Sequence, residues 1–373
     1  MSETAEVVVI GAGAVGASTA FHLARLGVTD VVLLERDTIA SGSTGRAVGG
    51  IRCQFGDETN IRVCQRSLAA FQHFTELLAE IGVDADCGLR QPGYLILVTD
   101  PAHLEFFRDA IALQNRLGVP TRELAPDAVR ALVPQLSLDG VIAAAYNPED
   151  GRMLPEAIAQ GYAAGAAALG VRVRQRTTVD GIAVEQGRVV AVDTPTGRIA
   201  TSTVVCCAGV WSAPLARDVG VEVPVEGHRH HVVFSAEDGG LPDDMPFVSD
   251  YATGFYVTRE VHGLVFGGNS SEFDDIVEPA VRRLPLLERL GIHSTWSGFY
   301  DMSPDHNAVV GEAPEVSRFL FATGFSGHGV MQSPAVGEHL AERVAGIAPS
   351  LDLMAFRRER FGDPDLQPER FVL

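Results

Sequence analysis

Three glycines near the N-terminus have the spacing of a phosphate-binding turn. Gly11, Gly13 and Gly16 form a GxGxxG pattern that separates an apolar run from a helical one. In such a unit the first glycine permits a tight turn, the second lets the backbone approach a pyrophosphate, and the third lets the helix pack closely on the strand. Glu35 ends the next apolar run, where a carboxylate can accept hydrogen bonds from ribose hydroxyls. These residues predict a dinucleotide site; the alternative is a turn that only packs a helix on a sheet.

A second group of chemically capable side chains lies at 228–231, which contains three histidines and one arginine. In a strand, His228 and His230 share one face, but two imidazoles without a neighbouring carboxylate or thiolate make a poor metal site. We therefore expect no metal here. A grip on an acidic substrate group is an alternative, and simple exposure to solvent is the favoured interpretation.

The elements that must position these residues change in character along the chain. The run 7–10 is continuously apolar, as expected of a parallel strand covered on both faces. Between 227 and 298, short strands are separated by Gly, Pro and Asp, as in an antiparallel sheet. The predicted strands lie at 7–10, 31–34, 171–174, 188–192, 203–207, 231–234, 254–257, 264–266 and 319–323, and the predicted helices at 17–26, 155–169 and 334–346.

We predict an α/β fold in which a discontinuous Rossmann-like cofactor-binding domain is interrupted by an inserted α+β substrate domain built on an antiparallel sheet. A chain of 373 residues is longer than one core usually serves, so two domains are expected. The predicted cofactor domain comprises residues 1–85, 148–226 and 299–373, and the substrate domain residues 86–147 and 227–298.

The composition and net charge limit the kinds of partner that the protein can bind. The formal net charge is -19, from 48 acidic and 29 basic residues, and such a field repels nucleic-acid phosphates and anionic membrane surfaces. The first residues are polar and acidic without a basic leader, and no apolar stretch reaches the roughly 18 residues of a membrane span. The 5 cysteines are scattered and lack zinc-site spacing, which favours a reducing cytoplasm over a disulfide framework. We expect neither nucleic acid nor a membrane span.

Motifs in five places carry a resemblance to a known family. They are GAGAVG at 11–16, SGSTGR at 41–46 continuing through GIR at 50–52, AGVWS at 208–212, YDMSPD at 300–305 and GFSGHG at 324–329. With these motifs in order, nearly the whole chain resembles the D-amino-acid-oxidase superfamily of flavoproteins. The nearest branch is that of glycine oxidase, sarcosine oxidase and the proline dehydrogenase β-subunit.

The resemblance implies FAD rather than NAD as the cofactor. By the family pattern, the loop 41–46 passes the pyrophosphate and the flavin, Val179 lies near the adenine, and Trp211 lines the cleft. A core aromatic is the alternative interpretation of Trp211. The expected cofactor contacts are Gly11, Gly13, Ala14, Val15, Gly16, Glu35, Arg36, Ser43, Thr44, Gly45, Arg46, Gly49, Gly50, Val179, Ala208, Gly209, Trp211, Gly327, His328, Gly329, Val330 and Met331.

The glycine-rich turn near the C-terminus suits such a cofactor. Reduction puts negative charge near flavin N1 and the C2 carbonyl, and backbone N–H groups leading into the helix after Met331 would stabilise that charge. Gly324, Gly327 and Gly329 would let the main chain come close enough to donate.

By similarity, Arg52 holds the substrate carboxylate. Arginine suits this role because its planar fork gives two parallel hydrogen bonds, whereas the alternative is an ordinary surface arginine. Tyr256 and Tyr300 would line the substrate pocket and donate hydrogen bonds from their hydroxyls. His328 in the glycine turn is as consistent with packing as with proton handling.

Four positions depart from the family pattern. Gly298 stands where sarcosine oxidases have the cysteine that tethers flavin, so FAD is expected to bind without a covalent bond. Met331 replaces a second carboxylate-binding lysine of monomeric sarcosine oxidase, which leaves Arg52 to hold the anion alone or implies a differently shaped substrate. Val265 replaces the lysine that activates oxygen in that enzyme, and Asn269 a pocket histidine. Without that positive charge, an oxidase is favoured only slightly over a dehydrogenase.

The expected reaction is hydride transfer from the α-carbon of a small amine or amino acid (sarcosine, glycine or proline-like) to flavin N5, giving an imine that water hydrolyses. Oxygen or another acceptor would reoxidise FADH2. Two alternatives stay open: a 2-hydroxy-acid dehydrogenase of the same superfamily, and a flavin-binding electron-transfer subunit of a hetero-oligomer. The expected partners are thus a small-molecule substrate and either an electron acceptor or a partner subunit.

Overall fold

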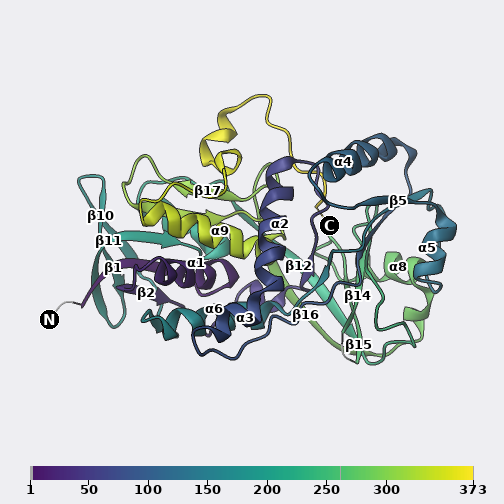
Figure 1. Cartoon of the computed structure of the whole chain (residues 1–373), viewed down its shortest axis with the longest axis horizontal. Helices are drawn as coiled ribbons and strands as arrows, with labels where there is room; N and C mark the ends of the chain where they lie inside the picture. The colour runs from purple at the N-terminus through teal and green to yellow at the C-terminus, as the bar shows by residue number, and fades with distance from the viewer. Residues whose placement is uncertain (1–2, 261, 373) are drawn as a thin grey trace.

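Two eight-stranded sheets lie side by side in the computed structural model, which describes residues 3–260 and 262–372. The sheet at the left of Figure 1 carries the N-terminal strand, and the sheet at the right carries the strands from the middle of the chain. A short two-stranded sheet joins β3 (Gly50–Ile51) to β7 (Gly151–Arg152). This small sheet therefore pairs two segments that lie about 100 residues apart in the sequence.

The first sheet is parallel at its centre. Strands β18, β11, β1, β2 and β8 run parallel in that order, and β17 adds an antiparallel edge to β18. Strands β9 and β10 extend β11 as an antiparallel ribbon. The bounds are β1 Glu3–Ile10, β2 Val31–Leu34, β8 Arg172–Arg174, β9 Gly181–Glu185, β10 Arg188–Thr194, β11 Gly197–Cys206, β17 Val309–Glu312 and β18 Phe319–Thr323.

Both faces of this sheet are buried, because its central strands are continuously apolar. Val7 and Val9 of β1 face a core shared with α1 (Ala14–Arg25), α6 (Pro155–Ala168) and α9 (Gly329–Val344). Val8 and Ile10 face a second core, which includes residues of β10 and of α7 (Ser212–Asp218). In Figure 1, α1, α6 and α9 lie together over the near face of the sheet.

Two helices begin earlier than the sequence predicted. Helix α1 starts at Ala14 rather than 17, and α9 starts at Gly329, so the prediction of a helix from 334 was wrong at its start. Pro334 lies inside α9, where it cannot donate to the carbonyl of Val330. The Ser333 hydroxyl donates to that carbonyl instead, at 2.8 Å. This local substitution explains how the helix accommodates a proline.

The second sheet is mostly antiparallel, with the order β16-β12-β15-β14-β13-β4-β6-β5 and one parallel pair, β4 with β13. The predicted α/β fold class with an antiparallel second sheet is confirmed, whereas the domain boundaries stay a prediction. The bounds are β4 Tyr94–Val98, β5 Arg122–Leu124, β6 Ala143–Asn147, β12 Glu226–Ser235, β13 Phe247–Asp250, β14 Tyr256–Glu260, β15 Gly263–Gly267 and β16 Ile292–Met302.

The remaining helices surround the two sheets. Helix α2 runs across the middle of the molecule in Figure 1 and packs on α9, whereas α4, α5 and α8 lie around the second sheet. The helices are α2 Glu58–Gln72, α3 Phe74–Ala79, α4 Leu104–Arg116, α5 Pro126–Leu132 and α8 Asp274–Arg283, and the short 3-10 turns are Thr44–Arg46, Pro101–His103, Gly209–Trp211, Pro285–Glu288, Met354–Phe356 and Arg358–Gly362.

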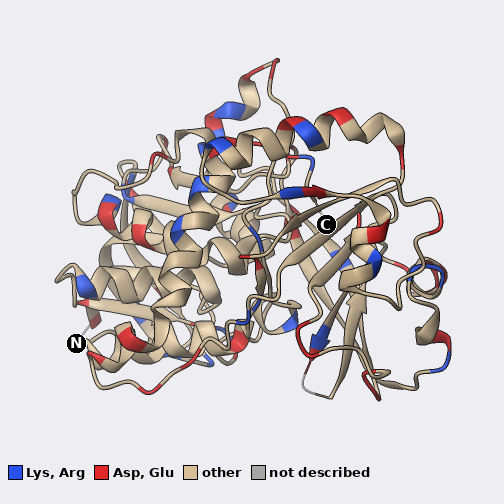
Figure 2. Ribbon diagram, turned by 45° about the vertical axis from the view of Figure 1, so that its right-hand side comes forward, with Lys and Arg blue, Asp and Glu red and all other residues tan. Residues whose placement is uncertain are grey.

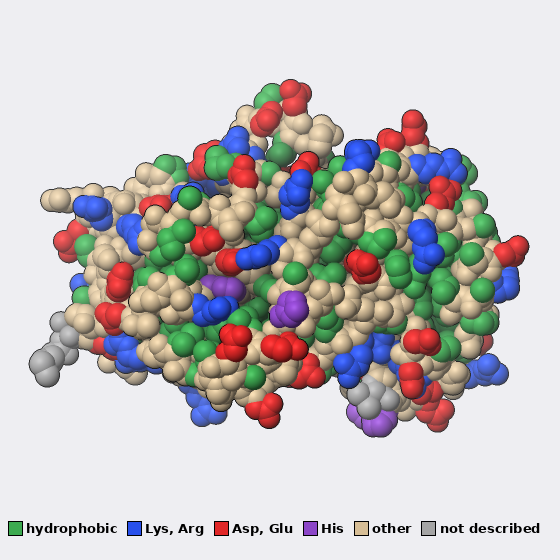
Figure 3. All heavy atoms as spheres, viewed as in Figure 1, with side chains coloured by type: hydrophobic (Ala, Val, Ile, Leu, Met, Phe, Trp, Pro, Cys, Tyr) green, Lys and Arg blue, Asp and Glu red, His purple; other side chains and the backbone are tan. Residues whose placement is uncertain are grey.

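Charge is spread over the outside of the molecule. Figure 2 shows acidic and basic residues distributed over the helices and loops, and the face in Figure 3 intersperses the two signs. None of the helices described is long and apolar enough to cross a membrane. Within the same residues, no three His, Cys, Asp or Glu side chains are grouped so that they could hold a metal ion.

A buried ion pair fastens α8 to the second sheet. Nη2 of Arg283 lies 2.7 Å from Oδ2 of Asp250, and only 5% and 2% of the two side chains are exposed. Replacing Arg283 by Ala should lower the free energy of unfolding by about 3 to 5 kcal/mol, because a buried carboxylate loses its partner.

Urea denaturation measures this change. The matched control is Arg282→Ala in the same helix, since that side chain is 55% exposed and its ion pair is long, at 3.7 Å. The control should change stability by about 1 kcal/mol or less. Equal effects of the two substitutions would contradict the role given to the buried pair.

Candidate active site

A cavity of about 360 Å³ opens at the carboxyl ends of β1, β2 and β11 and reaches β14 and β16 of the second sheet. This is the edge at which parallel α/β sheets bind ligands. Its volume falls within the roughly 300 to 1,000 Å³ usual for ligand pockets. The predicted residues that line it are Gly11, Gly13, Ala14, Val15, Glu35, Arg36, Ser43, Thr44, Arg46, Val179, Ala208, Gly209, Trp211, Tyr256, Tyr300, Gly327, Gly329 and Val330.

The three N-terminal glycines sit where side chains would collide. Gly11 has a φ of +97°, and a Cβ on it would lie 2.6 Å from the carbonyl oxygen of Cys207. A Cβ on Gly16 would lie 1.9 Å from the carbonyl oxygen of Gly11, so this residue is required for close packing of α1 on β1 and does not line the cavity. Gly13 faces the Thr44 hydroxyl, 3.0 Å from its would-be Cβ. The turn thus exposes bare backbone to the cavity.

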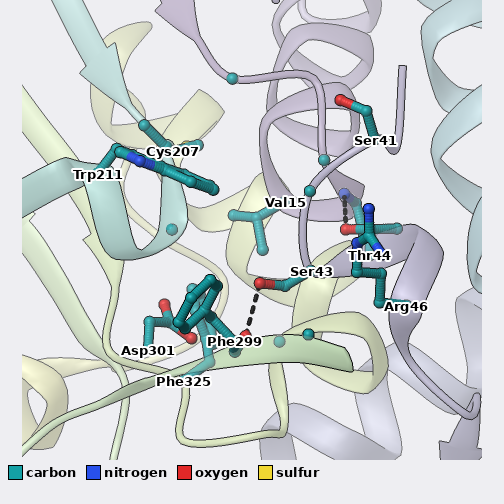
Figure 4. A pocket seen from close by; sticks show the side chains of 18 of the residues that line it. Val15, Ser41, Ser43, Thr44, Arg46, Cys207, Trp211, Phe299, Asp301 and Phe325 are labelled. Atoms are coloured by element: carbon teal, nitrogen blue, oxygen red, sulfur yellow. Dashed lines mark hydrogen bonds between the residues drawn. The ribbon is translucent and has the colours of Figure 1, made fainter. Parts of the chain in front are cut away.

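Glu35 is held at the cavity wall by the neighbouring backbone. Its carboxylate accepts hydrogen bonds from the N–H groups of Ala12 at 2.9 Å and Asp37 at 3.0 Å. The guanidinium of Arg36 lies 4.1 Å from the ring centre of Trp211. Trp211 is 38% exposed and lines the cavity, as Figure 4 shows, so the alternative of a core aromatic was wrong.

On the opposite side, Ser43, Phe299, Phe325 and Asp301 close the cavity (Figure 4). The Ser43 hydroxyl donates to the carbonyl of Phe299 at 2.6 Å, which ties the 41–46 loop to β16. Asp301 accepts a hydrogen bond from the N–H of Gly324 at 2.7 Å and so holds the glycine-rich turn. Burial raises the pKa of Asp301 to about 6.

The glycine-rich turn needs its unusual backbone. Gly324, Ser326 and Gly327 have positive φ angles, and a Cβ on Gly327 would lie 2.8 Å from the ring of Tyr300. The turn leads directly into α9 at Gly329. It therefore brings the N-terminus of α9 to the cavity wall.

Two helix N-termini consequently meet one cavity, that of α1 and that of α9. The first N–H groups of a helix lack partners within the helix, and the helix dipole favours negative charge there. At the start of α1, the N–H of Ala14 donates to the Thr44 hydroxyl at 3.1 Å. Bare glycine backbone, a carboxylate at the cavity wall and two anion-attracting helix ends fit a diphosphate cofactor such as FAD, whose ring gains negative charge on reduction.

A smaller cavity of about 60 Å³ adjoins the first, and Tyr256, Tyr300, Gly327 and Val330 line both. Of the predicted residues, the smaller cavity also includes Gly49, Gly50, Arg52, His328 and Met331. Gly45 lines neither, because it packs where a Cβ would lie 2.6 Å from the carbonyl oxygen of Ala40 and 2.8 Å from Glu156.

Arg52 is the central charge of the smaller cavity. Only 1% of it is exposed, so the alternative of a surface arginine was wrong. Its guanidinium donates to the carbonyls of Gln54 and Phe371, and its carbon lies 4.2 Å from the ring centre of Phe55. Among the described residues, no carboxylate forms an ion pair with it. A buried cation held by neutral groups is suited to receive an anion.

His328 supports this arginine. Its Nε2 lies 3.0 Å from Nη2 of Arg52, and since a guanidinium has only donors, Nε2 accepts. Burial and then the Arg52 charge hold the pKa of His328 well below its usual value. The imidazole is therefore neutral near pH 7, which favours an orienting role over proton handling.

Asp150 fixes the backbone beside Arg52. It accepts hydrogen bonds from the N–H of Cys53 at 2.8 Å and from the side chain of Gln54 at 3.1 Å. Burial raises the pKa of Asp150 to about 7 in spite of these bonds. Because Asp150 precedes β7, which pairs with β3, the small sheet sets the position of Arg52.

Aromatic rings form the rest of the substrate side. Burial raises the pKa of Tyr300 to about 12 and that of Tyr256 far above its usual value, so both hydroxyls stay protonated and can donate. His230 stacks on Tyr300, with ring centres 3.9 Å apart, and is 9% exposed. Exposure was therefore the wrong interpretation of His230, because strand β12 turns this side chain inward.

Two aromatic residues of the smaller cavity were not predicted from the sequence. Tyr94 and Phe247 stack with ring centres 4.4 Å apart and line the same cavity as Arg52. They belong to β4 and β13, which are paired although they are distant in sequence. Further residues of the larger cavity that carried no predicted role include Cys207, His230, Phe299, Asp301 and Phe325.

The departures from the family pattern have definite places. Gly298 lines the larger cavity, where a Cβ would lie 3.0 Å from Cβ of Arg46. Val265 is 5% exposed on β15. The amide of Asn269 donates to the carbonyl of Val372 at 3.4 Å.

Comparison with known proteins identifies the class. The family model described as FAD dependent oxidoreductase (DAO) matches residues 6–343. The chain therefore belongs to the DAO family of FAD-dependent oxidoreductases.

Particular relatives agree in fold. The L-proline dehydrogenase structure from P. horikoshii is 32% identical with a TM-score of 0.88, over 98% of this chain and 100% of that one. The glycine oxidase structure from Geobacillus kaustophilus has a TM-score of 0.86 at 24% identity, over 96% and 99% of the two chains. Mouse mitochondrial sarcosine dehydrogenase is 30% identical over 97% of this chain but only 42% of its own length. The chain thus spans less than half of such curated relatives.

Proposed function

We propose that this chain oxidises a small amine or amino acid that carries a carboxylate, such as sarcosine, glycine or proline. Bound FAD would supply the chemistry by accepting a hydride from the substrate α-carbon at N5, leaving an imine that water hydrolyses. The observation that carries the proposal is the buried, carboxylate-free guanidinium of Arg52 in a cavity continuous with the larger one. The names of the sarcosine and proline dehydrogenases support the substrate class.

The chain's own residues would bind and orient this substrate. Arg52 would attract the carboxylate by its buried charge and donate from the N–H groups of Nε and Nη1 that Gln54 leaves free, while His328 and Phe371 accept from Nη2 and keep the guanidinium in place. Tyr256 and Tyr300, which line both cavities, would donate hydroxyl hydrogen bonds where the two cavities meet. The small volume of about 60 Å³ beside Arg52 suits a small substrate and leaves little room for water.

The residues on the cofactor side would hold FAD as the sequence predicted. The α1 N-terminus and Gly13 would face the diphosphate, Glu35 the ribose, and the α9 N-terminus the flavin. Each assignment is supported by the residue's place in the cavity lining.

We propose further that FAD binds without a covalent bond. Gly298 offers no thiol, and burial raises the pKa of the cavity-lining Cys207, so its thiol stays protonated and unreactive. Denaturing the purified yellow protein with acid should therefore release all of its flavin into the supernatant. Flavin that stays with the precipitated polypeptide would contradict this expectation.

The acceptor of the electrons would be oxygen or a separate acceptor, and because the apolar Val265 stands where a lysine would favour oxygen, the preference for oxygen is only slight. Because relatives such as sarcosine dehydrogenase are more than twice as long, a partner subunit is compatible with the proposal.

All five cysteines are buried and free, which supports the expected reducing cytoplasm.

Anaerobic mixing tests the reaction class. The holoenzyme is mixed with sarcosine, glycine, proline and other amino acids. At least one of these compounds should bleach the flavin absorbance within seconds. A panel that leaves the flavin oxidised would count against amine oxidation. Bleaching by 2-hydroxyglutarate alone would favour a 2-hydroxy-acid dehydrogenase instead.

Replacing Arg52 by Ala tests the carboxylate site. The loss of a buried charge partner should raise KM for the best substrate strongly. The resulting fall in kcat/KM should correspond to about 2 to 4 kcal/mol of lost transition-state stabilisation. Steady-state kinetics measure it, with Arg62→Ala as the control, since that side chain is 53% exposed on α2. An unchanged KM would show that another group binds the carboxylate.

A further inference from the structure

The segment 369–372 lies beside Arg52. The carbonyl of Phe371 accepts a hydrogen bond from Nη2 of Arg52. The ring of Phe371 is 1% exposed and packs against Phe106 and Phe107 of α4, with ring centres 5.0 and 5.1 Å apart. One of the few groups that hold the guanidinium is thus a backbone carbonyl far away in sequence.

Glu369 fixes the position of that carbonyl. Its carboxyl group accepts a hydrogen bond from the N–H of Phe371 at 2.7 Å and another from the N–H of Gly56 at 3.1 Å. Its own N–H donates to the carbonyl of Asp305 at 2.9 Å. The side chain therefore links the C-terminal segment to the chain that carries Arg52.

These contacts close a ring. Arg52 donates to the carbonyls of Gln54 and Phe371, and Glu369 receives an N–H from each of the two segments that present those carbonyls. Glu369 is 4% exposed and reaches the guanidinium through the backbone of these two segments. Resting on the proposed function, we propose that Glu369 is a positioning residue that sets Arg52 for the substrate carboxylate.

The ring is built around a carboxyl group that burial keeps uncharged near neutral pH. Burial, and then the neighbouring Asp57, raise the pKa of Glu369 to about 8, so it is protonated near neutral pH. Deprotonation would put a second anion beside Asp57 and a competing charge near Arg52. The charged or titratable groups around it are Asp57 at the start of α2, Arg52 after β3, Asp305 and His306 after β16, Tyr251 after β13, and His328 at the start of α9.

The sign of the pH effect follows from the raised pKa. The stabilisation from a protonated Glu369 is complete below the ordinary carboxyl pKa and is lost as pH rises through about 8. Carboxylate binding should weaken over the same range. A glutamine, which keeps an acceptor and a donor but cannot ionise, should remove the part of this dependence that Glu369 causes and leave the part from Asp150 near pH 7.

The test uses the holoenzyme with propionate as the probe, its dissociation constant measured from the change in flavin absorbance. Glu369→Ala should weaken propionate binding about tenfold, whereas Glu369→Gln should stay within about twofold of wild type near pH 7. Between about pH 7 and pH 9 the wild type should lose more affinity than Glu369→Gln, which keeps only the change that Asp150 causes as it ionises near pH 7. Binding of the neutral propionamide should be unchanged throughout.

Two comparisons separate the possible failures. Glu359→Gln, 48% exposed, is the control for the loss of a carboxylate near the C-terminus. If Arg52→Ala abolishes propionate binding while both Glu369 variants bind and titrate like wild type, the positioning role is overturned and the proposed function stands. If wild type and Arg52→Ala bind propionate equally or not at all, both are overturned. Should Glu369→Ala fail to fold, the pH profile of Glu369→Gln alone decides.

Discussion

The organisation of the substrate side follows from a positive charge removed from water. Placing a guanidinium in a protein interior costs several kcal/mol unless its donors are satisfied. Around Arg52 this is done by the carbonyls of Gln54 and Phe371 and the neutral imidazole of His328, and among the described residues no carboxylate forms an ion pair with it. These groups lie on three segments distant in sequence, so the charge can be buried only when the complete fold brings them together.

The same arrangement connects the two sheets. Arg52 follows β3, His328 precedes α9, and Phe371 anchors in the aromatic cluster beside α4. The N-terminus of α9 faces the larger cavity and also positions His328, which contacts Arg52. The larger and the smaller cavity share this helix end, which under the proposed function would hold a bound carboxylate at a fixed distance from the flavin.

Local patterns made part of this predictable from sequence. Gly11, Gly13, Gly16 and Glu35 occupy a short stretch in which each residue's conformational role follows from its spacing. Their expected place at the end of β1 and β2 agrees with the structure. The assignment of Arg52 came from resemblance alone, since nothing in its immediate sequence indicates burial.

Other features depend on contacts that no local pattern reveals. Tyr94 and Phe247 meet because β4 and β13 pair in parallel across a long separation. His230 is buried by stacking on Tyr300 of the neighbouring strand, although its own segment is rich in charge. A backbone carbonyl such as that of Phe371 carries no sequence signal at all.

The most direct test of the central claim compares the best amino-acid substrate with its carboxamide, which removes the negative charge and little else. Anaerobic stopped-flow measurement of flavin reduction at equal concentrations gives the answer. A buried guanidinium that binds the carboxylate predicts reduction by the amide at least about 100-fold slower, since a desolvated charge pair is lost. Equal rates for the acid and the amide would contradict it.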